Sequence, residues 1–367
     1  MVHLPIQLES CSGVIGLSRG IPKMIKAERL LIDHEGLSFS RGDRSGTVLD
    51  CRKGFVVQSF FNGFSDSSDF PISSHGIDSS TERSFFRDSL ILGWGGGIFR
   101  IRRSNGKKED ILLICPLNSE SMNILEQREA SLSEEKMRES GCIEGIFIER
   151  VSSLNENDIE KLKRRFEESN FYFVVKTLLT SEELFSSIEK TGKTPIDHLL
   201  SENLLNEKTI IVGGDWLTNR DVEAIRSQHS WIAHLPAEAS YTGSGSNFPL
   251  IKFVSSSYWK LMIGTGKQLD SPLFLSSLSL LLYRFMTWST AIDESTVLRM
   301  LWSGWELLGK KIACIDEGCQ PILLVYDKNK IEERSFTYLL GRRGYTLVPR
   351  LICSSYGCIN IEREDLI

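Results

Sequence analysis

The sequence predicts an α/β protein, a (β/α)8 barrel of the TIM type with a small β-sandwich domain built from both termini. From about residue 56 to residue 309, short apolar runs alternate with longer helical stretches, which is typical of a parallel sheet. Strand-like segments with Gly and Asp turns open the chain and return at its end. The expected domains are a barrel over residues 57–311 and a composite β-sandwich over residues 1–56 and 312–367.

Each part of the chain supports one element of this fold. The opening runs SGVIGL and ERLLIDHEGLSFSRGDRSGTVLD, and the closing runs IACIDEGCQPILLVYD and LVPRLICSSYGCINI, have the pattern of short strands. Strand and helix patterns alternate in IEGIFIERV, NENDIEKLKRRFEES, FYFVVKTLL and SEELFSSIEKTG. The polar stretch 118–141 predicts a solvated surface helix. The apolar stretch 272–292 predicts a buried helix, because Arg284 and several Ser and Thr residues make it unsuitable for a membrane.

Composition excludes several functional classes. Hydrophobic residues make up 41% and charged residues 25%, as in ordinary globular proteins. The net charge of -5 provides no basic surface, so nucleic acid is not expected as a partner. No membrane association is expected either. Eight cysteines without a Cys-x-x-Cys pair, behind an N-terminus without a signal-peptide pattern, predict a cytoplasmic protein with reduced thiols.

Four separated segments carry the motifs of one known family. They are VLDCRKGFVVQSFFNGFSDSSDFP, then FYFVVKTLLTSEELFSSIEKTGKTPIDHLLSENLL with TIIVGGDWLTNRDVEAI, then WIAHLPAEASYTGSGSNFPLIKF with LMIGTGKQLDSP, and finally VLRMLWSGWELLGKKIACIDEGCQPILLVYD. In this order they resemble the amidohydrolase superfamily, of the cytosine deaminase, guanine deaminase and chlorohydrolase type. The resemblance spans nearly the whole chain. It implies a metal-dependent hydrolase that acts on carbon–nitrogen bonds.

The metal positions that the resemblance implies are all replaced. The two histidines of the first strand motif are Phe64 and Asp66, the next two histidines are Lys176 and Gly213, and the aspartate is Gly266. Phe and Gly offer no ligand atom, and a lysine ammonium repels a cation. The zinc or iron of the family is therefore predicted to be absent, and no cofactor is expected.

A shifted metal site remains an alternative, with ligands drawn from His75, His198, His229 and His234, although no two of these are spaced as a metal-binding pair. His234 is more simply expected to hydrogen-bond at a strand end. The segment Thr191–Thr194 ends like a phosphate-binding loop but lacks its first glycine and follows a helix, so nucleotide binding is not expected there.

No catalytic residue is assigned, but a pocket is expected at the barrel mouth. Its candidate residues are Phe64, Asp66, Lys176, Gly213, Asp215, His234, Glu238, Gly266 and Lys267. A buried Lys176 needs a carboxylate, and Asp66 is the expected partner.

Three functional hypotheses follow. The first is a catalytically inactive homologue that binds a small molecule or a protein partner. The second is an active hydrolase or deaminase that works through a metal-free or shifted site, with Lys176 and Asp66 as its reactive pair. The third is a structural protomer of an oligomer, for instance a homodimer.

Overall fold

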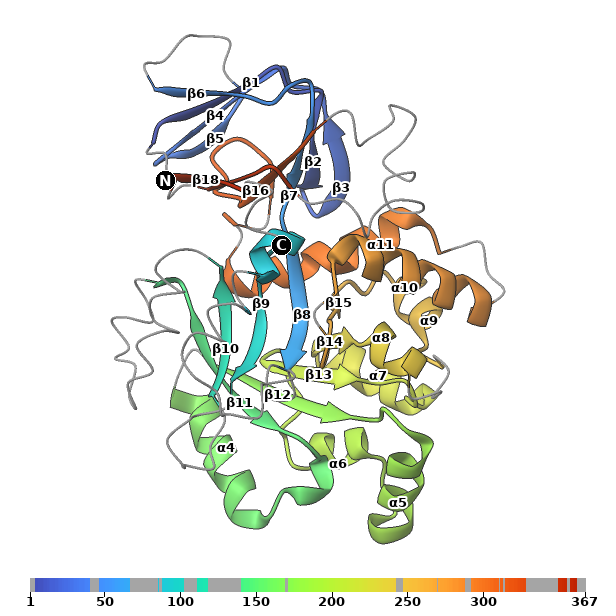
Figure 1. Ribbon diagram of the computed structural model, residues 1–367. Helices are drawn as coiled ribbons and strands as arrows, with labels where there is room; N and C mark the ends of the chain where they lie inside the picture. The colour runs from blue at the N-terminus through green and yellow to red at the C-terminus, as the bar shows by residue number, and fades with distance from the viewer. Residues whose placement is uncertain are drawn as a thin grey trace, which may run out of the picture.

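The computed structural model describes residues 4–39, 46–66, 85, 88–101, 111–117, 140–168, 171–241, 247–268, 270–287, 292–309, 311–312, 314–327, 349–354 and 357–361. Two parts are visible in Figure 1, a β-domain and a larger barrel with helices around it. The β-domain joins segments from both ends of the chain.

The larger part is an eight-stranded sheet rolled into a barrel. Its strands, in their order around the sheet, are β8 (Phe60–Asp66), β9 (Trp94–Ile101), β10 (Ile111–Pro116), β11 (Ile143–Ile148), β12 (Tyr172–Thr177), β13 (Thr209–Gly213), β14 (Trp231–His234) and β15 (Leu261–Ile263). The barrel closes where β8 meets the end of β15, through a parallel bridge between Ser65 and Gly266. The predicted α/β fold of the TIM type is confirmed.

One strand departs from the all-parallel barrel. The β10 strand runs antiparallel to both β9 and β11, whereas the other neighbouring strands are parallel. A parallel crossover needs a dozen or more residues. Residues 102–110 between β9 and β10 are too few for one, so these two strands pair as neighbours in a hairpin.

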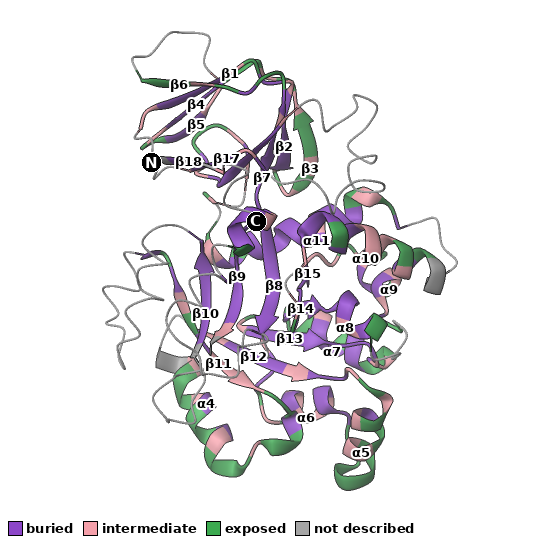
Figure 2. Cartoon of the chain, in the orientation of Figure 1, coloured by how far each residue is buried: buried purple, intermediate pink, exposed green. Residues whose placement is uncertain are grey.

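Helices cover the outside of the barrel. In chain order they are η2 (Val151–Ser153), α4 (Glu156–Glu168), α5 (Ser181–Thr191), α6 (Pro195–Ser201), α7 (Asn219–Ser227), α8 (Pro236–Tyr241), α9 (Leu250–Val254), α10 (Pro272–Thr287), α11 (Glu294–Ser303) and η3 (Gly304–Leu308). Figure 2 shows that α4 and α5 expose much of their surface, whereas the barrel strands are mostly buried. The burial pattern is that of amphipathic helices around a buried barrel core.

The β-domain consists of two sheets. One has the order β5 (Gly36–Ser38), β4 (Arg29–Asp33), β1 (Ile6–Glu9) and β6 (Thr47–Asp50); the other has the order β18 (Gly357–Asn360), β17 (Leu351–Ser354), β16 (Leu323–Tyr326), β7 (Phe55–Gln58), β2 (Gly13–Ser18) and β3 (Ile21–Ile25). Strands from the two ends of the chain therefore share one sheet. A separate core, which includes Leu8, Leu30, Val56 and Leu323, fills this domain.

The cysteines differ from expectation. Disulfides join Cys115 to Cys142, Cys314 to Cys319 and Cys353 to Cys358, so the prediction of eight reduced thiols is wrong for these six. Cys11 and Cys51 are free and buried in the β-domain. The spacing of the cysteines in the sequence did not reveal these pairs. Cys115 and Cys142 lie on β10 and next to β11, and Cys353 and Cys358 lie on β17 and β18, so these cysteines meet only when the strands pair.

The apolar stretch 272–292 also differs from expectation. It forms α10, whose Leu275 and Tyr283 are buried but whose Leu281 is 69% exposed, so the helix is buried on one face only. Within the described ranges, no helix is long and apolar enough to cross a membrane. The predicted surface helix over 118–141 lies almost entirely outside the described residues.

Candidate functional site

The predicted pocket residues lie at one end of the barrel, where the parallel strands finish. Phe64 and Asp66 lie in the last three residues of β8, Lys176 precedes the last residue of β12, and Gly213 ends β13. Backbone hydrogen bonds join β8 to the segment after β15, from Asp66 N to Gly266 O (2.8 Å) and from Gly266 N to Phe64 O (3.0 Å). This is the end at which barrel enzymes carry their active sites.

Lys176 forms an ion pair with Glu238 from α8. Its Nζ atom lies 3.0 Å from Glu238 Oε2, and the two side chains are only 11% and 13% exposed. The other carboxylate oxygen, Oε1, accepts a hydrogen bond from the backbone N–H of Lys267 at 2.9 Å. The expected pairing of Lys176 with Asp66 is therefore wrong. A largely buried lysine does have a carboxylate partner, as physical reasoning required, but the carboxylate comes from helix α8 rather than from strand β8.

Asp66 is paired with Arg100, a residue that sequence analysis did not single out. Arg100 Nη1 lies 3.0 Å from Asp66 Oδ2, and the guanidinium lies over the ring of Phe147, 4.4 Å from its centroid. Phe147 in turn stacks on Phe64 with centroids 5.4 Å apart. The stack leaves Phe64 fully buried. The sequence pointed to this partner of Asp66 only in that Arg100 lies on β9, the strand next to β8.

Two glycines at this end have their side-chain space filled by other residues. A Cβ atom at Gly266 would lie 2.2 Å from Glu238 Oε1 and 2.7 Å from Glu238 Cδ. A Cβ atom at Gly213 would lie 2.8 Å from Leu179 Cδ2 and 2.7 Å from the carbonyl oxygen of Thr177. Glu238 and Leu179 thus occupy the volume that larger side chains at these two positions would need.

His234 anchors a fully buried polar network. Its Nε2 atom lies 2.9 Å from Asp215 Oδ1, its Nδ1 atom lies 2.7 Å from the hydroxyl of Tyr283, and its ring stacks on Phe248. Burial, and secondarily the charge of Asp215, raises the pKa of Tyr283 well above its usual value, so its hydroxyl keeps its proton. The contacts fit a histidine that donates from Nε2 to Asp215 and accepts from Tyr283 at Nδ1. The expectation that His234 hydrogen-bonds at a strand end is confirmed.

Two polar atoms next to this network lack a partner. Asp215 Oδ2 and Trp216 Nε1 are buried and make no hydrogen bond with any described residue. Buried polar atoms are almost always satisfied, so unsatisfied ones call for an explanation. The two residues lie two and three positions after the end of β13, at the same end of the barrel as Lys176 and Glu238.

The remaining histidines do not meet at the mouth. His198 is on α6, His229 follows α7, and His75 lies outside the described residues. Across the part of the chain that the structure describes, no three His, Cys, Asp or Glu side chains are placed to hold a metal ion.

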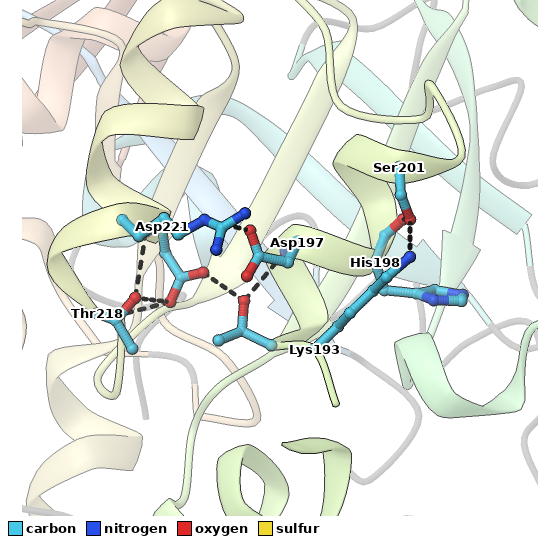
Figure 3. Close-up of polar contacts among 8 residues, drawn as sticks. Lys193, Asp197, His198, Ser201, Thr218 and Asp221 are labelled. Atoms are coloured by element: carbon cyan, nitrogen blue, oxygen red, sulfur yellow. Dashed lines mark hydrogen bonds and ion pairs between the residues drawn. The ribbon is translucent and has the colours of Figure 1, made fainter. Parts of the chain in front are cut away.

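The segment that ends like a phosphate-binding loop is a link between two helices. Gly192 ends α5 with a left-handed backbone (φ 70°), and Thr194 caps the start of α6 by accepting from Asp197 N. Thr194 also donates to the buried Asp221, which closes a capping box with Thr218 on α7 (Figure 3). These polar groups bond to one another and fix the packing of α6 on α7, so this cluster is structural.

Comparison with known proteins gives this geometry a context. No family model matches the chain. A 5-methylthioadenosine/S-adenosylhomocysteine deaminase of Pyrococcus abyssi is 32% identical over 157 residues, which are 41% of this chain and 36% of that protein. The protein of the same name from Thermococcus sibiricus is 29% identical over 46% of this chain and 40% of its own length. The chain thus matches less than half of the length of these curated relatives.

Solved structures agree over almost the whole chain. An adenosine deaminase from Xanthomonas campestris with bound zinc superimposes with a TM-score of 0.72 over 99% of this chain and 94% of its own, at 12% identity. The chain has the fold of these deaminases and resembles the amidohydrolase superfamily over part of its sequence. A guanine deaminase from C. acetobutylicum with bound guanine gives a TM-score of 0.71 over 97% of this chain, again at 12% identity.

The residues at the mouth do not fit the zinc ion that the superfamily fold implies. Zinc needs three or four imidazole, thiolate or carboxylate ligands around one point. Of the five positions that the resemblance assigned to ligands, only Asp66 has a suitable atom, and its carboxylate is bonded to Arg100. The cation of Lys176 and the carboxylate of Glu238 bond to each other in the space beside Gly266.

Proposed function

We propose that this protein works without a metal and uses the barrel mouth to bind a small polar molecule. The observation that carries the proposal is the position of Glu238. Its carboxylate fills the side-chain space of Gly266 and neutralises Lys176, so an internal ion pair stands where the resemblance implies a metal site. Metal-assisted hydrolysis requires a cation with an open coordination position, and this arrangement supplies neither the ligands nor the space.

Three groups at the same end support ligand binding. The ammonium of Lys176 has three donors, and Glu238 is its one hydrogen-bond partner among the described residues. Asp215 Oδ2 is an unused acceptor and Trp216 Nε1 is an unused donor. Ligand pockets typically combine apolar walls with a few such convergent polar groups. Phe64 and Leu179 supply apolar side chains at this end of the barrel.

The names of the relatives favour a second candidate, a deaminase. The curated relatives are named 5-methylthioadenosine/S-adenosylhomocysteine deaminases, and the local sequence identity reaches 41% over 71 residues in the Pyrococcus horikoshii protein. A deaminase would have to activate water at a mouth that carries Phe64, Gly213 and Gly266. The two candidates therefore predict opposite outcomes for the same measurements.

The test combines elemental analysis with an ammonia-release assay. The purified protein, before and after incubation with zinc, is analysed for bound metal and assayed with 5-methylthioadenosine, S-adenosylhomocysteine, adenosine and guanine. We expect no stoichiometric metal and no ammonia. About one zinc per chain, bound at the mouth and accompanied by ammonia release, would overturn the proposal in favour of the deaminase.

Ligand binding is tested separately by thermal shift, with the same compounds and with small carbonyl compounds and carboxylic acids. The control is the double variant K176M/E238L, which removes both charges while keeping apolar volume. A stabilising compound whose effect is lost in this variant supports the proposal. If every compound leaves the melting temperature of the two proteins equally unchanged, the binding role is wrong.

A further inference from the structure

Lys176 has the placement of a reactive amine. It projects from the second-last residue of a parallel barrel strand, at the end where barrel enzymes place catalytic groups. Its Nζ atom is 3.0 Å from Glu238 Oε2, and a carboxylate at this distance is within reach to accept a proton from the ammonium. Both side chains are about nine-tenths buried. Transfer of one ammonium proton to Glu238 would leave a neutral amine as the nucleophile.

The carboxylate of Glu238 is fixed in position for proton exchange with Lys176. Its Oε1 atom accepts the backbone N–H of Lys267, which fixes the carboxylate while Oε2 faces Lys176. The close approach to Gly266 leaves the carboxylate little freedom to rotate away. A nucleophile and a fixed base in contact form the basic arrangement of nucleophilic catalysis by side chains.

We infer that Lys176 binds carbonyl compounds, of the aldehyde or α-keto acid class, as a reversible imine. The inference rests on the proposed metal-free ligand site. Glu238 takes one proton from the ammonium. The amine lone pair then bonds to the carbonyl carbon, and the carbonyl oxygen takes the second N–H proton to give a carbinolamine. Glu238 protonates the hydroxyl, the C–O bond breaks to release water as the nitrogen lone pair forms the C=N bond, and the third N–H proton returns to Glu238. Amine and carbonyl thus become imine and water, with no oxidant or reductant.

Another lysine provides an internal comparison. Burial lowers the pKa of Lys260, which would make it the more reactive amine if basicity alone decided. Lys260 precedes β15, at the opposite end of the strand from Gly266, and donates to the carbonyl oxygen of His229. It has no carboxylate within ion-pair distance among the described residues. Preferential reaction at Lys176 would therefore reflect the Glu238 pair rather than general accessibility.

The experiment uses glyoxylate as the probe and sodium cyanoborohydride to trap the imine, with peptide mapping by mass spectrometry. We expect Lys176 to be labelled about 100-fold faster than Lys260, the lower end of what general acid–base assistance contributes. E238Q should remove most of this difference, and K176R should remove the adduct while keeping the cation. Melting temperatures identify any variant that fails to fold.

Two results would overturn the inference. One is equal labelling of Lys176 and Lys260 in the native protein, and the other is an unchanged Lys176 rate in a folded E238Q variant. Metal content and glyoxylate binding without reductant are measured on the same preparation. If the protein is metal-free and binds glyoxylate through Lys176 but forms no adduct, only the imine inference is wrong. If the protein is a zinc-loaded deaminase, the proposed function is wrong.

Discussion

The carboxylate of Glu238 lies in the volume that a side chain at Gly266 would fill, 2.2 Å from where its Cβ atom would be. Gly266 also has a positive φ of 64°, a conformation that other residues adopt at a cost. The same carboxylate bonds to Lys176 and to the backbone of Lys267. The segment after β15 and helix α8 are therefore fitted to each other through one side chain.

Replacing Gly266 by alanine tests this fit. G266A should destabilise the protein by about 3 kcal/mol, because the new methyl group displaces a carboxylate that cannot move without breaking two hydrogen bonds. Gly192 is the matched control, since it has a similar φ of 70° and open space around its Cβ position. G192A should cost only about 1 kcal/mol in urea unfolding. Equal losses would show that backbone conformation alone explains the glycine.

The Lys176–Glu238 pair makes a second prediction. K176M leaves a buried carboxylate without its cation and should cost about 3 kcal/mol, the lower end for a buried pair because both groups retain some exposure. The double variant K176M/E238L should recover most of that loss, as measured by chemical denaturation. K190M, at an exposed position on α5, serves as the control. Additive losses in the double variant would contradict the coupling.

The His234 network makes a third prediction. Y283F removes the hydroxyl that satisfies His234 Nδ1 and should destabilise the fold by about 1–3 kcal/mol, the cost of a buried polar atom left without its partner. Tyr241 is 76% exposed, so Y241F should have little effect. Thermal and urea unfolding of both variants measure the difference. A Y283F protein as stable as Y241F would mean that the hydroxyl contributes nothing.

The fourth prediction concerns pH. Burial raises the pKa of Asp270, and its Oδ2 atom has no hydrogen-bond partner among the described residues. The folded state therefore holds this proton more tightly than the unfolded state does. Below the unfolded pKa the carboxyl group does not lower the free energy of unfolding, and as pH rises through the folded pKa it lowers that free energy. D270N should stabilise the protein at pH 7, and the gain should vanish below about pH 4. A gain that is independent of pH would point to packing instead of charge.

The barrel was predictable because its periodicity is local. Alternating apolar and helical segments identify parallel strands one at a time, whatever their partners are. The direction of β10 was not predictable in this way, because it depends on the length of the connection from β9 and not on the strand itself. The same holds for the disulfides, since Cys115 and Cys142 meet only when β10 and β11 are paired.

The places of the candidate residues in the fold were predictable, but the contacts between their side chains were not. Family motifs placed Lys176, Gly213 and Gly266 at the barrel mouth, and the structure has them there. The partner of Lys176 depends on how helix α8 sits over the end of β15, which no strand periodicity describes. Glu238 was among the candidates because of its place in a motif, and Arg100 was missed because it lies outside every motif.

The shared sheet of the β-domain constrains the order in which the chain acquires its structure. Strand β7 pairs with β16, and about 270 residues separate Phe55 from its neighbour Tyr326, so at 5–20 residues per second β7 waits on the order of 10–60 s for that partner during synthesis. The apolar strands β2 and β7 emerge from the ribosome long before β16–β18 cover them. A nascent chain stalled after the barrel would therefore expose an incomplete sheet, with the edge of β7 that β16 pairs with left open.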